Sequence, residues 1–357
     1  MATANVEFEK QVSADMRRSY KNHREHYLNG DLSKKWKPRV NYHLFESFDE
    51  LIKDASGMLK KIMLSAAEES SLDGIVIDLT IKRGSNISYC TIASYDICES
   101  EKGHAVLSMN ISTFERLYKP DLSNLRIRDI KSSIYHELRH HKDIDFLVHC
   151  NKFLERAKER FPSPHEYQFR NSYLYLIEYL TGLRGEGFAD FEREPKFPPL
   201  FFSKYKRALR EKDSKTAERY FFEALKKHTN TVTKVFDFLQ DKPYILFFEL
   251  INNVEKKDSS PLELETSFDK YYQGKMMFFV LALAELKDNG FDSLFKFEKL
   301  PSDVYEAVEK KVLGLSNLSE FFEYYYASAR KLGLKEEHMI IPEKHVKGYL
   351  ALEAKLT

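Results

Sequence analysis

Residues 75–82 read Ile-Val-Ile-Asp-Leu-Thr-Ile-Lys, with a large aliphatic residue at every second position. This period of two is typical of a β-strand that turns one face toward a hydrophobic core. Short turn-forming stretches, each containing glycine, separate it from two further stretches with strand character, at 87–95 and 104–112. The sequence therefore predicts a small β-meander at roughly 74–112.

Helical spacing of apolar residues replaces this alternation on both sides of the meander. It is seen at 47–70 and through nearly all of the chain after Ser112. We therefore predict an α+β fold, in which a helix and a small sheet precede many helices. The candidate helices after Ser112 lie near 113–118, 128–149, 150–160, 167–181, 183–194, 203–227, 231–240, 243–255, 267–289, 302–313, 317–332 and 343–355.

Three parts are expected along the chain. Residues 1–70 form a helical N-terminal segment, which starts with a polar and mildly basic arm or helix at 1–40. Residues 71–195 contain the sheet and the first helices and form a second subdomain. Residues 196–357 form a helical C-terminal subdomain.

The composition narrows the class of protein. The chain has 357 residues, and 56 Lys and Arg nearly balance 55 Asp and Glu, which argues against a general polyanion binder. The longest strongly apolar run, at 276–286, is shorter than the roughly 20 residues that span a bilayer, and residues 1–9 have no signal-peptide pattern. The sparse Cys90, Cys98 and Cys150 do not suggest a disulfide framework. A cytoplasmic location is therefore expected.

One motif carries chemistry: residues 136–140 read His-Glu-Leu-Arg-His, an H-E-x-x-H pattern in a predicted helix. His136 and His140 project from one helix face about one turn apart, which suits two ligands of a tetrahedral zinc ion. Glu137 can act as general base toward a zinc-bound water without binding the metal. The alternative is a charged surface helix with coincidental histidines. We expect His141, which leaves the shared face, to be a neighbour or surface residue.

A catalytic zinc site needs a third protein ligand, with the fourth position left to water. The longer motif H-E-x-x-H-x-x-G-x-x-H is excluded, because its Gly and last His are replaced by Asp143 and Phe146. Residues 184–190 read Arg-Gly-Glu-Gly-Phe-Ala-Asp, and they place Glu186 and Asp190 four apart on one helix face. We expect Glu186 to bind the metal and Asp190 to accept the N–H of a ligand histidine.

H-E-x-x-H followed by E-x-x-x-D resembles the gluzincins, the thermolysin-like superfamily of zinc peptidases. The segment 185–189, Gly-Glu-Gly-Phe-Ala, is similar to the Asn-Glu-Gly-Phe-Ala segment of the zinc aminopeptidases in that superfamily. The resemblance spans roughly residues 75–295 through short motifs only, and it implies a zincin-like core. Glu178 and Glu192 stay rival ligands, and an ordinary exposed acid is the alternative for Asp190.

The resemblance implies two further roles. The stretch that begins at Tyr271 resembles Y-x-x-G of the aminopeptidases, in which the tyrosine stabilises the oxyanion; Tyr272 and a packing tyrosine are the alternatives. Zincins bind substrate along an edge strand, which implies this role for the strand 104–112 with Ser108 and Asn110. That strand has no glutamate matching the one by which the aminopeptidases bind a free amine, so the resemblance does not extend to exopeptidase specificity.

The prediction is therefore a zinc metallopeptidase of gluzincin type that acts on a peptide or protein, with no nucleic-acid or membrane partner. A zincin-fold binding or regulatory module without turnover is one alternative. A narrow cytosolic protease that cuts a single regulator is another. The sequence leaves the oligomeric state open.

Overall fold

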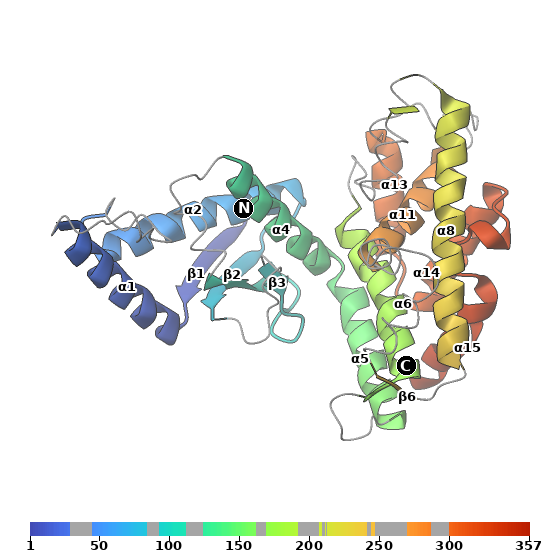
Figure 1. Cartoon of the computed structure of the whole chain (residues 1–357), viewed down its shortest axis with the longest axis horizontal. Coiled ribbons are helices and arrows are strands. Elements are labelled where there is room, and N and C mark those ends of the chain that lie inside the picture. Colours follow the sequence, from blue (N-terminus) through green and yellow to red (C-terminus); the bar gives the residue numbers. More distant parts are fainter. Residues whose placement is uncertain are drawn as a thin grey trace. The chain divides into compact units, whose positions relative to one another are not determined.

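Contacts divide the chain into two compact units, Met1–Ile144 and Asp145–Thr357, and each is described by itself. This boundary differs from the predicted ones after residues 70 and 195, because those followed motifs and proline-containing breaks rather than contacts. The two units contain a mixed sheet with helices and a mainly helical assembly, so the α+β class is confirmed. The computed structural model (Figure 1) describes residues 1–28, 45–83, 93–111, 124–161, 169–191, 207–208, 211, 213–240, 244–246, 270–286 and 300–357.

The sheet of the first unit has four described strands, in the lateral order β1-β2-β4-β3. β1 (Thr3–Phe8) pairs in parallel with β2 (Val76–Lys82), and β2 pairs in parallel with β4 (His104–Asn110). The short β3 (Ala93–Tyr95) is antiparallel to β4 and forms one edge of the described sheet. The sheet is therefore mixed.

The meander prediction is wrong in its strand pairing, and one strand of the sheet was not predicted at all. In a meander consecutive strands pair antiparallel, whereas Ile77 of β2 lies opposite Ala105 of β4 in a parallel pair. The polar stretch 1–40 also begins with a strand, which the sequence analysis did not predict. The alternation of β1 is weak because only Val6 and Phe8 are large apolar residues there.

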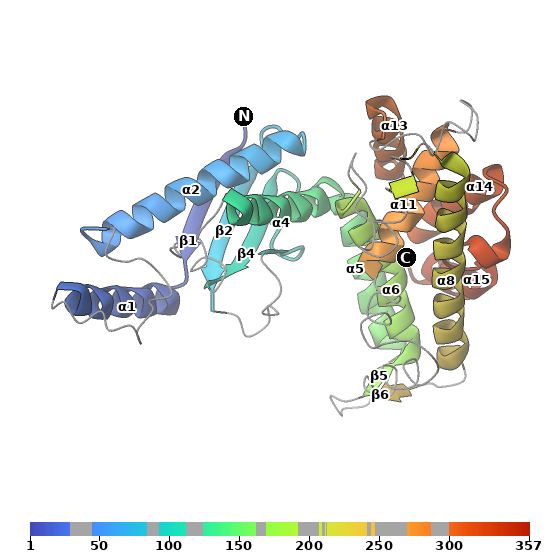
Figure 2. The ribbon, with the colours of Figure 1, turned by 45° about the horizontal axis from the view of Figure 1, so that its top comes forward.

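Two helices cover one face of this sheet. α2 (Phe48–Glu69) and α4 (Asn124–Lys142) pack against each other and against the strands, as Figure 2 shows, and α1 (Lys10–Leu28) adds apolar residues to the same core. The helix predicted at 47–70 and the apolar stripe of the motif helix are thus confirmed. The shared core buries Leu51 and Leu59 of α2, Ile77, Leu79 and Ile81 of β2, Leu107 and Met109 of β4, and Ile130, Ile134 and Leu138 of α4.

The second unit is mainly helical in its described residues. The paired strands β5 (Phe169–Asn171) and β6 (Tyr244–Leu246) form a small antiparallel ribbon, and β6 replaces the start of the helix predicted near 243–255. The helices are α5 (Ile144–Arg160), α6 (Ser172–Ala189), α8 (Ser214–Gln240), α11 (Lys270–Leu286), α13 (Ser302–Leu313), α14 (Leu318–Lys331), α15 (Glu343–Leu356) and the short 3₁₀ turn η3 (Glu336–His338).

Two predicted breaks in this unit are absent, because tertiary contacts outweigh local propensity. α6 continues through Gly182, over which the side chain of Lys270 packs. α8 continues through Thr229, whose hydroxyl donates to the carbonyl oxygens of Leu225 and Met339 at 2.8 Å each. The predicted helix 113–118 lies outside the described residues.

α11 forms the centre of this unit and contacts α6, α13 and α14 (Figure 1). It crosses α6 where Gly274 meets Gly187: a Cβ on Gly274 would lie 2.5 Å from the carbonyl oxygen of Leu183 and 2.7 Å from the Cα of Gly187. Only glycine permits this approach of two backbones. Among the described helices, none has both the length and the apolar character that a membrane span requires.

Candidate metal centre

The two histidines of the motif meet on one face of α4. Their Nε2 atoms lie 3.2 Å apart, and their rings meet edge to face with centroids separated by 4.8 Å. Two imidazole nitrogens bound to one tetrahedral zinc at about 2.0–2.1 Å would be about 3.3 Å apart. His136 and His140 therefore have the separation that two zinc ligands need, and both side chains are half-buried.

Glu137 is held by the edge strand of the sheet. Its Oε2 accepts a hydrogen bond of 2.9 Å from the backbone N–H of Tyr95 in β3. The next residue, Asp96, donates its own N–H to the carbonyl oxygen of Val106, so the N–H of Tyr95 points away from β4. The carboxylate thus binds an outward-facing group of the sheet edge, adjacent to the histidine pair.

The strand predicted to be the substrate-binding edge, β4, is not at the edge of the described sheet. β4 lies between β2 and β3, and Ser108 is opposite both Thr80 and Ser94, so Ser108 and Asn110 belong to an interior strand. The hydroxyl oxygens of Ser108 and Ser94 are 2.8 Å apart. Position along the chain does not reveal the lateral order of strands: β3 precedes β4 in the sequence, yet it pairs with the side of β4 that faces away from β2. The edge beside α4 is therefore β3.

His141 is buried, with 5% of its surface exposed, so it is not a surface residue and is instead a neighbour of the motif, the other position expected for it. Its Nδ1 lies 3.1 Å from the hydroxyl oxygen of Tyr95. Burial lowers the pKa of His141 to about 4 and raises the pKa of Tyr95 to about 12. The ring is therefore neutral at pH 7, and its tautomer decides whether Nδ1 or the phenol is the donor in this hydrogen bond.

Sequence reasoning missed Tyr95 as a site residue. It lies 42 positions before Glu137, in a strand predicted only from its composition. The doubled histidine at 140–141 was the one available signal that the motif extends beyond H-E-x-x-H. No spacing rule links that signal to a tyrosine on a strand, because their contact arises from the packing of α4 on the sheet.

The two predicted acids lie at the C-terminal end of α6, and each forms an ion pair with α11. Glu186 Oε1 is 3.2 Å from Lys270 Nζ, and Asp190 Oδ2 is 2.7 Å from Lys275 Nζ. The expected shared face of the two acids is thus seen, and the lysines were not predicted. The histidines belong to the first unit and Glu186 to the second, so their assignment to one site is a proposal.

The other predicted residues of the second unit occupy less specific positions. Tyr271 lies in the first turn of α11 with 40% of its surface exposed, and Lys270 Nζ lies 5.4 Å from the centre of its ring. Tyr272 has Lys275 Nζ at 5.6 Å from its ring. In this stretch the glycine of Y-x-x-G serves the helix crossing, and the oxyanion role of the tyrosine stays a prediction. Of the rival ligands, Glu178 is half-buried on α6, and Glu192 lies outside the described residues.

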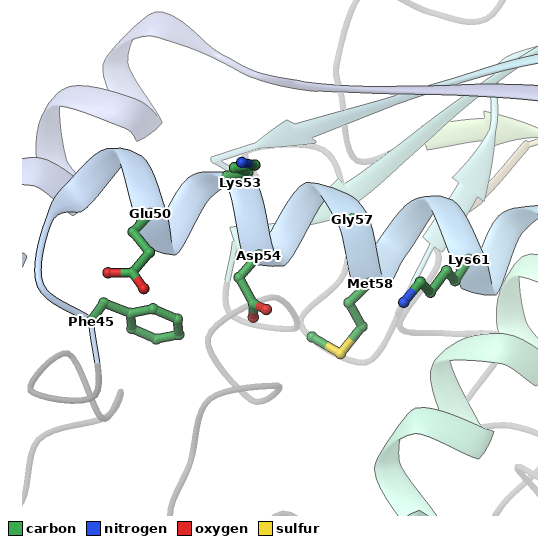
Figure 3. A pocket seen from close by; sticks show the side chains of 7 residues that line it. All are labelled: Phe45, Glu50, Lys53, Asp54, Gly57, Met58 and Lys61. Carbon is green, nitrogen blue, oxygen red and sulfur yellow. The ribbon is translucent and has the colours of Figure 1, made fainter.

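A shallow hollow lies elsewhere, on the outer side of α2 (Figure 3). It contains two carboxylates and two ammonium groups, but no histidine and no residue of the motif helix. It is therefore separate from the candidate metal centre. Its lining residues are Phe45, Glu50, Lys53, Asp54, Gly57, Met58 and Lys61.

Comparisons of the chain with protein families, with curated proteins and with solved structures find no match. The likeness to gluzincins therefore rests on the short motifs themselves. The geometry of α4 and β3 carries the functional argument, because it brings two imidazole side chains and a carboxylate together within one unit.

Proposed function

We propose that the chain is a zinc metallopeptidase of gluzincin type, built on a zincin-like core. The observation that carries the proposal is the 3.2 Å separation of the two Nε2 atoms, with Glu137 directly after the first histidine on the same helix. This separation fits a shared zinc ion, and the adjacent carboxylate fits a general base.

We assign the metal ligands to His136, His140 and Glu186. Two imidazoles and one carboxylate form the donor set of open catalytic zinc sites, in which the fourth position is left to water. Asp190, one turn after Glu186, accepts the N–H of a ligand histidine in this assignment and fixes its orientation. Lys270 holds the carboxylate of Glu186 in the described structure and would release it to the metal.

Zinc at these residues would supply a Lewis acid for the peptide carbonyl and would lower the pKa of a coordinated water to about 7. Glu137 would serve as the general base, holding the proton of the attacking water on its carboxylate and passing it to the leaving nitrogen. The hydroxyl of Tyr271 donates a hydrogen bond to the oxyanion in this proposal. The substrate is a peptide or protein, with no nucleic-acid or membrane partner. The described cysteines Cys98 and Cys150 are free, which suits a reducing compartment such as the cytoplasm.

A second candidate function is a zincin-fold regulatory module without turnover. It is favoured by the ion pairs Lys270–Glu186 and Lys275–Asp190, because ammonium groups that neutralise both acids compete with a metal. Zinc analysis combined with a peptidase assay on mixed peptides separates the two functions. Zinc with hydrolysis supports the peptidase, and zinc without hydrolysis supports the module or an enzyme that cuts a single partner.

The first prediction concerns the metal. The purified chain will contain stoichiometric zinc by elemental analysis, and His136→Ala or His140→Ala will lose it, because two ligands cannot hold the ion tightly. His26→Ala, an exposed histidine on α1, is the matched control and will keep its zinc. Equal zinc in all variants would refute the site.

The second prediction concerns the third ligand. Glu186→Ala will weaken zinc binding, measured by chelator competition, by more than the roughly 10- to 100-fold typical of an outer partner. Glu178→Ala, two turns earlier on the same helix, will bind zinc like the unaltered chain. If the two variants exchange these results, Glu178 is the ligand and the assignment of Glu186 is wrong.

A further inference from the structure

One residue of the edge strand contacts two residues of the H-E-x-x-H motif and the residue that follows the motif. The backbone N–H of Tyr95 donates to Glu137 at 2.9 Å, and its hydroxyl lies 3.1 Å from Nδ1 of His141. Its ring stacks beside the ring of His140, with centroids 6.5 Å apart and an interplanar angle of 21°. The general base, one ligand and the residue after that ligand are thus all in contact with a single side chain and its peptide group.

These contacts constrain different degrees of freedom of the motif. The bond to Glu137 fixes the direction of its carboxylate, and the stacked ring limits rotation of the His140 imidazole. The bond to His141 ties the last turn of α4 to the edge of the sheet. All four residues belong to the first unit, so the arrangement is complete within Met1–Ile144.

We propose that Tyr95 is the positioning residue of the metal centre, acting through its hydrogen bond to His141 and its contacts with His140 and Glu137. This inference rests on the proposed function, since it concerns the same metal. Tyr95 touches neither the metal nor the substrate carbonyl in this role. It fixes the rotamers of groups that do, as outer partners of metal ligands do in zinc enzymes.

The test uses zinc affinity and the absorption spectrum of the cobalt(II)-substituted full chain. Tyr95→Phe keeps the ring and the peptide N–H but removes the hydroxyl, and it will weaken zinc binding by about tenfold. The visible bands of bound cobalt, which report ligand geometry, will shift. Ser94→Ala is the matched control, because Ser94 precedes Tyr95 on β3 and its hydroxyl contacts Ser108 instead. It will leave both readouts unchanged.

A double-mutant cycle tests whether Tyr95 acts on the metal site through its hydrogen bond to His141. His141→Phe will weaken zinc binding as Tyr95→Phe does, and the double variant will be no weaker than either single one, because both remove the same hydrogen bond. The inference would be overturned if the two single losses of zinc affinity added up in the double variant. It would also be overturned if Tyr95→Phe had the zinc affinity and the cobalt bands of the unaltered chain. Either result would leave the peptidase proposal standing. An unaltered chain that binds no zinc would overturn both.

Discussion

Glu137→Gln will lower kcat for peptide hydrolysis by about 10²–10⁴ while the protein keeps its zinc. The amide has nearly the same shape and retains one oxygen to accept the N–H of Tyr95, so the contact seen at 2.9 Å can persist. It cannot take a proton from water, and general-base catalysis typically contributes 10²–10⁴ to the rate. We expect kcat on a mixture of peptides to fall by about this factor, with unchanged metal content.

The matched control is Glu69→Gln. Glu69 lies at the end of α2, and its carboxylate pairs with Lys131 of α4, so this variant will leave kcat unaltered. The Glu137 variant separates three roles. Cleavage at the rate of the unaltered chain would disprove the general base. Loss of zinc together with activity would instead identify Glu137 as a ligand or as a residue on which the fold of the motif depends.

Gly274→Ala will lower the free energy of unfolding of the second unit by about 2–3 kcal/mol. The added Cβ would lie 2.5 Å from the carbonyl oxygen of Leu183 and 2.7 Å from the Cα of Gly187, both backbone atoms, so the helices must separate. Overpacking of a close contact typically costs about 1–3 kcal/mol. The value can be measured from denaturant midpoints followed by circular dichroism, at constant slope.

The control for this substitution lies in the same unit. Gly348 is an exposed residue of α15, and a Cβ there meets nothing within 4 Å. Gly348→Ala should therefore stabilise the protein by about 0.5–1 kcal/mol, since alanine is the better helix former. If Gly274→Ala has the same midpoint as Gly348→Ala, α6 and α11 are not in backbone contact.

Local periodicity was a sound guide to most elements of this chain. The alternation at 75–82 predicted β2, and the apolar stripe of 47–70 predicted α2, because both patterns report which face of an element is buried. The same kind of pattern did not predict β1, the strand at the N-terminus. β1 has few large apolar residues. It is stabilised by parallel pairing with β2, and this contact cannot be inferred from the residues of β1 alone.

In the candidate site too, some features were predictable from the sequence and others were not. The shared face of His136 and His140 follows from helix geometry alone, and the structure agrees with it. The role proposed for Ser108 failed because an edge is a property of the assembled sheet. Lys270 and Lys275 were missed because their partners lie on another helix, at positions set by the crossing of α6 and α11.

The sequence alone determined that α4 is a helix, that His136 and His140 share a face of it, and that the carboxylate of Glu137 is adjacent to them in the chain. These are consequences of spacing within one element, where each residue adds a fixed rotation and rise. Only the tertiary structure decided the lateral order of the strands and the position of Tyr95 against the motif. Both depend on contacts between residues far apart in the chain, which hydrophobic burial and strand pairing select together.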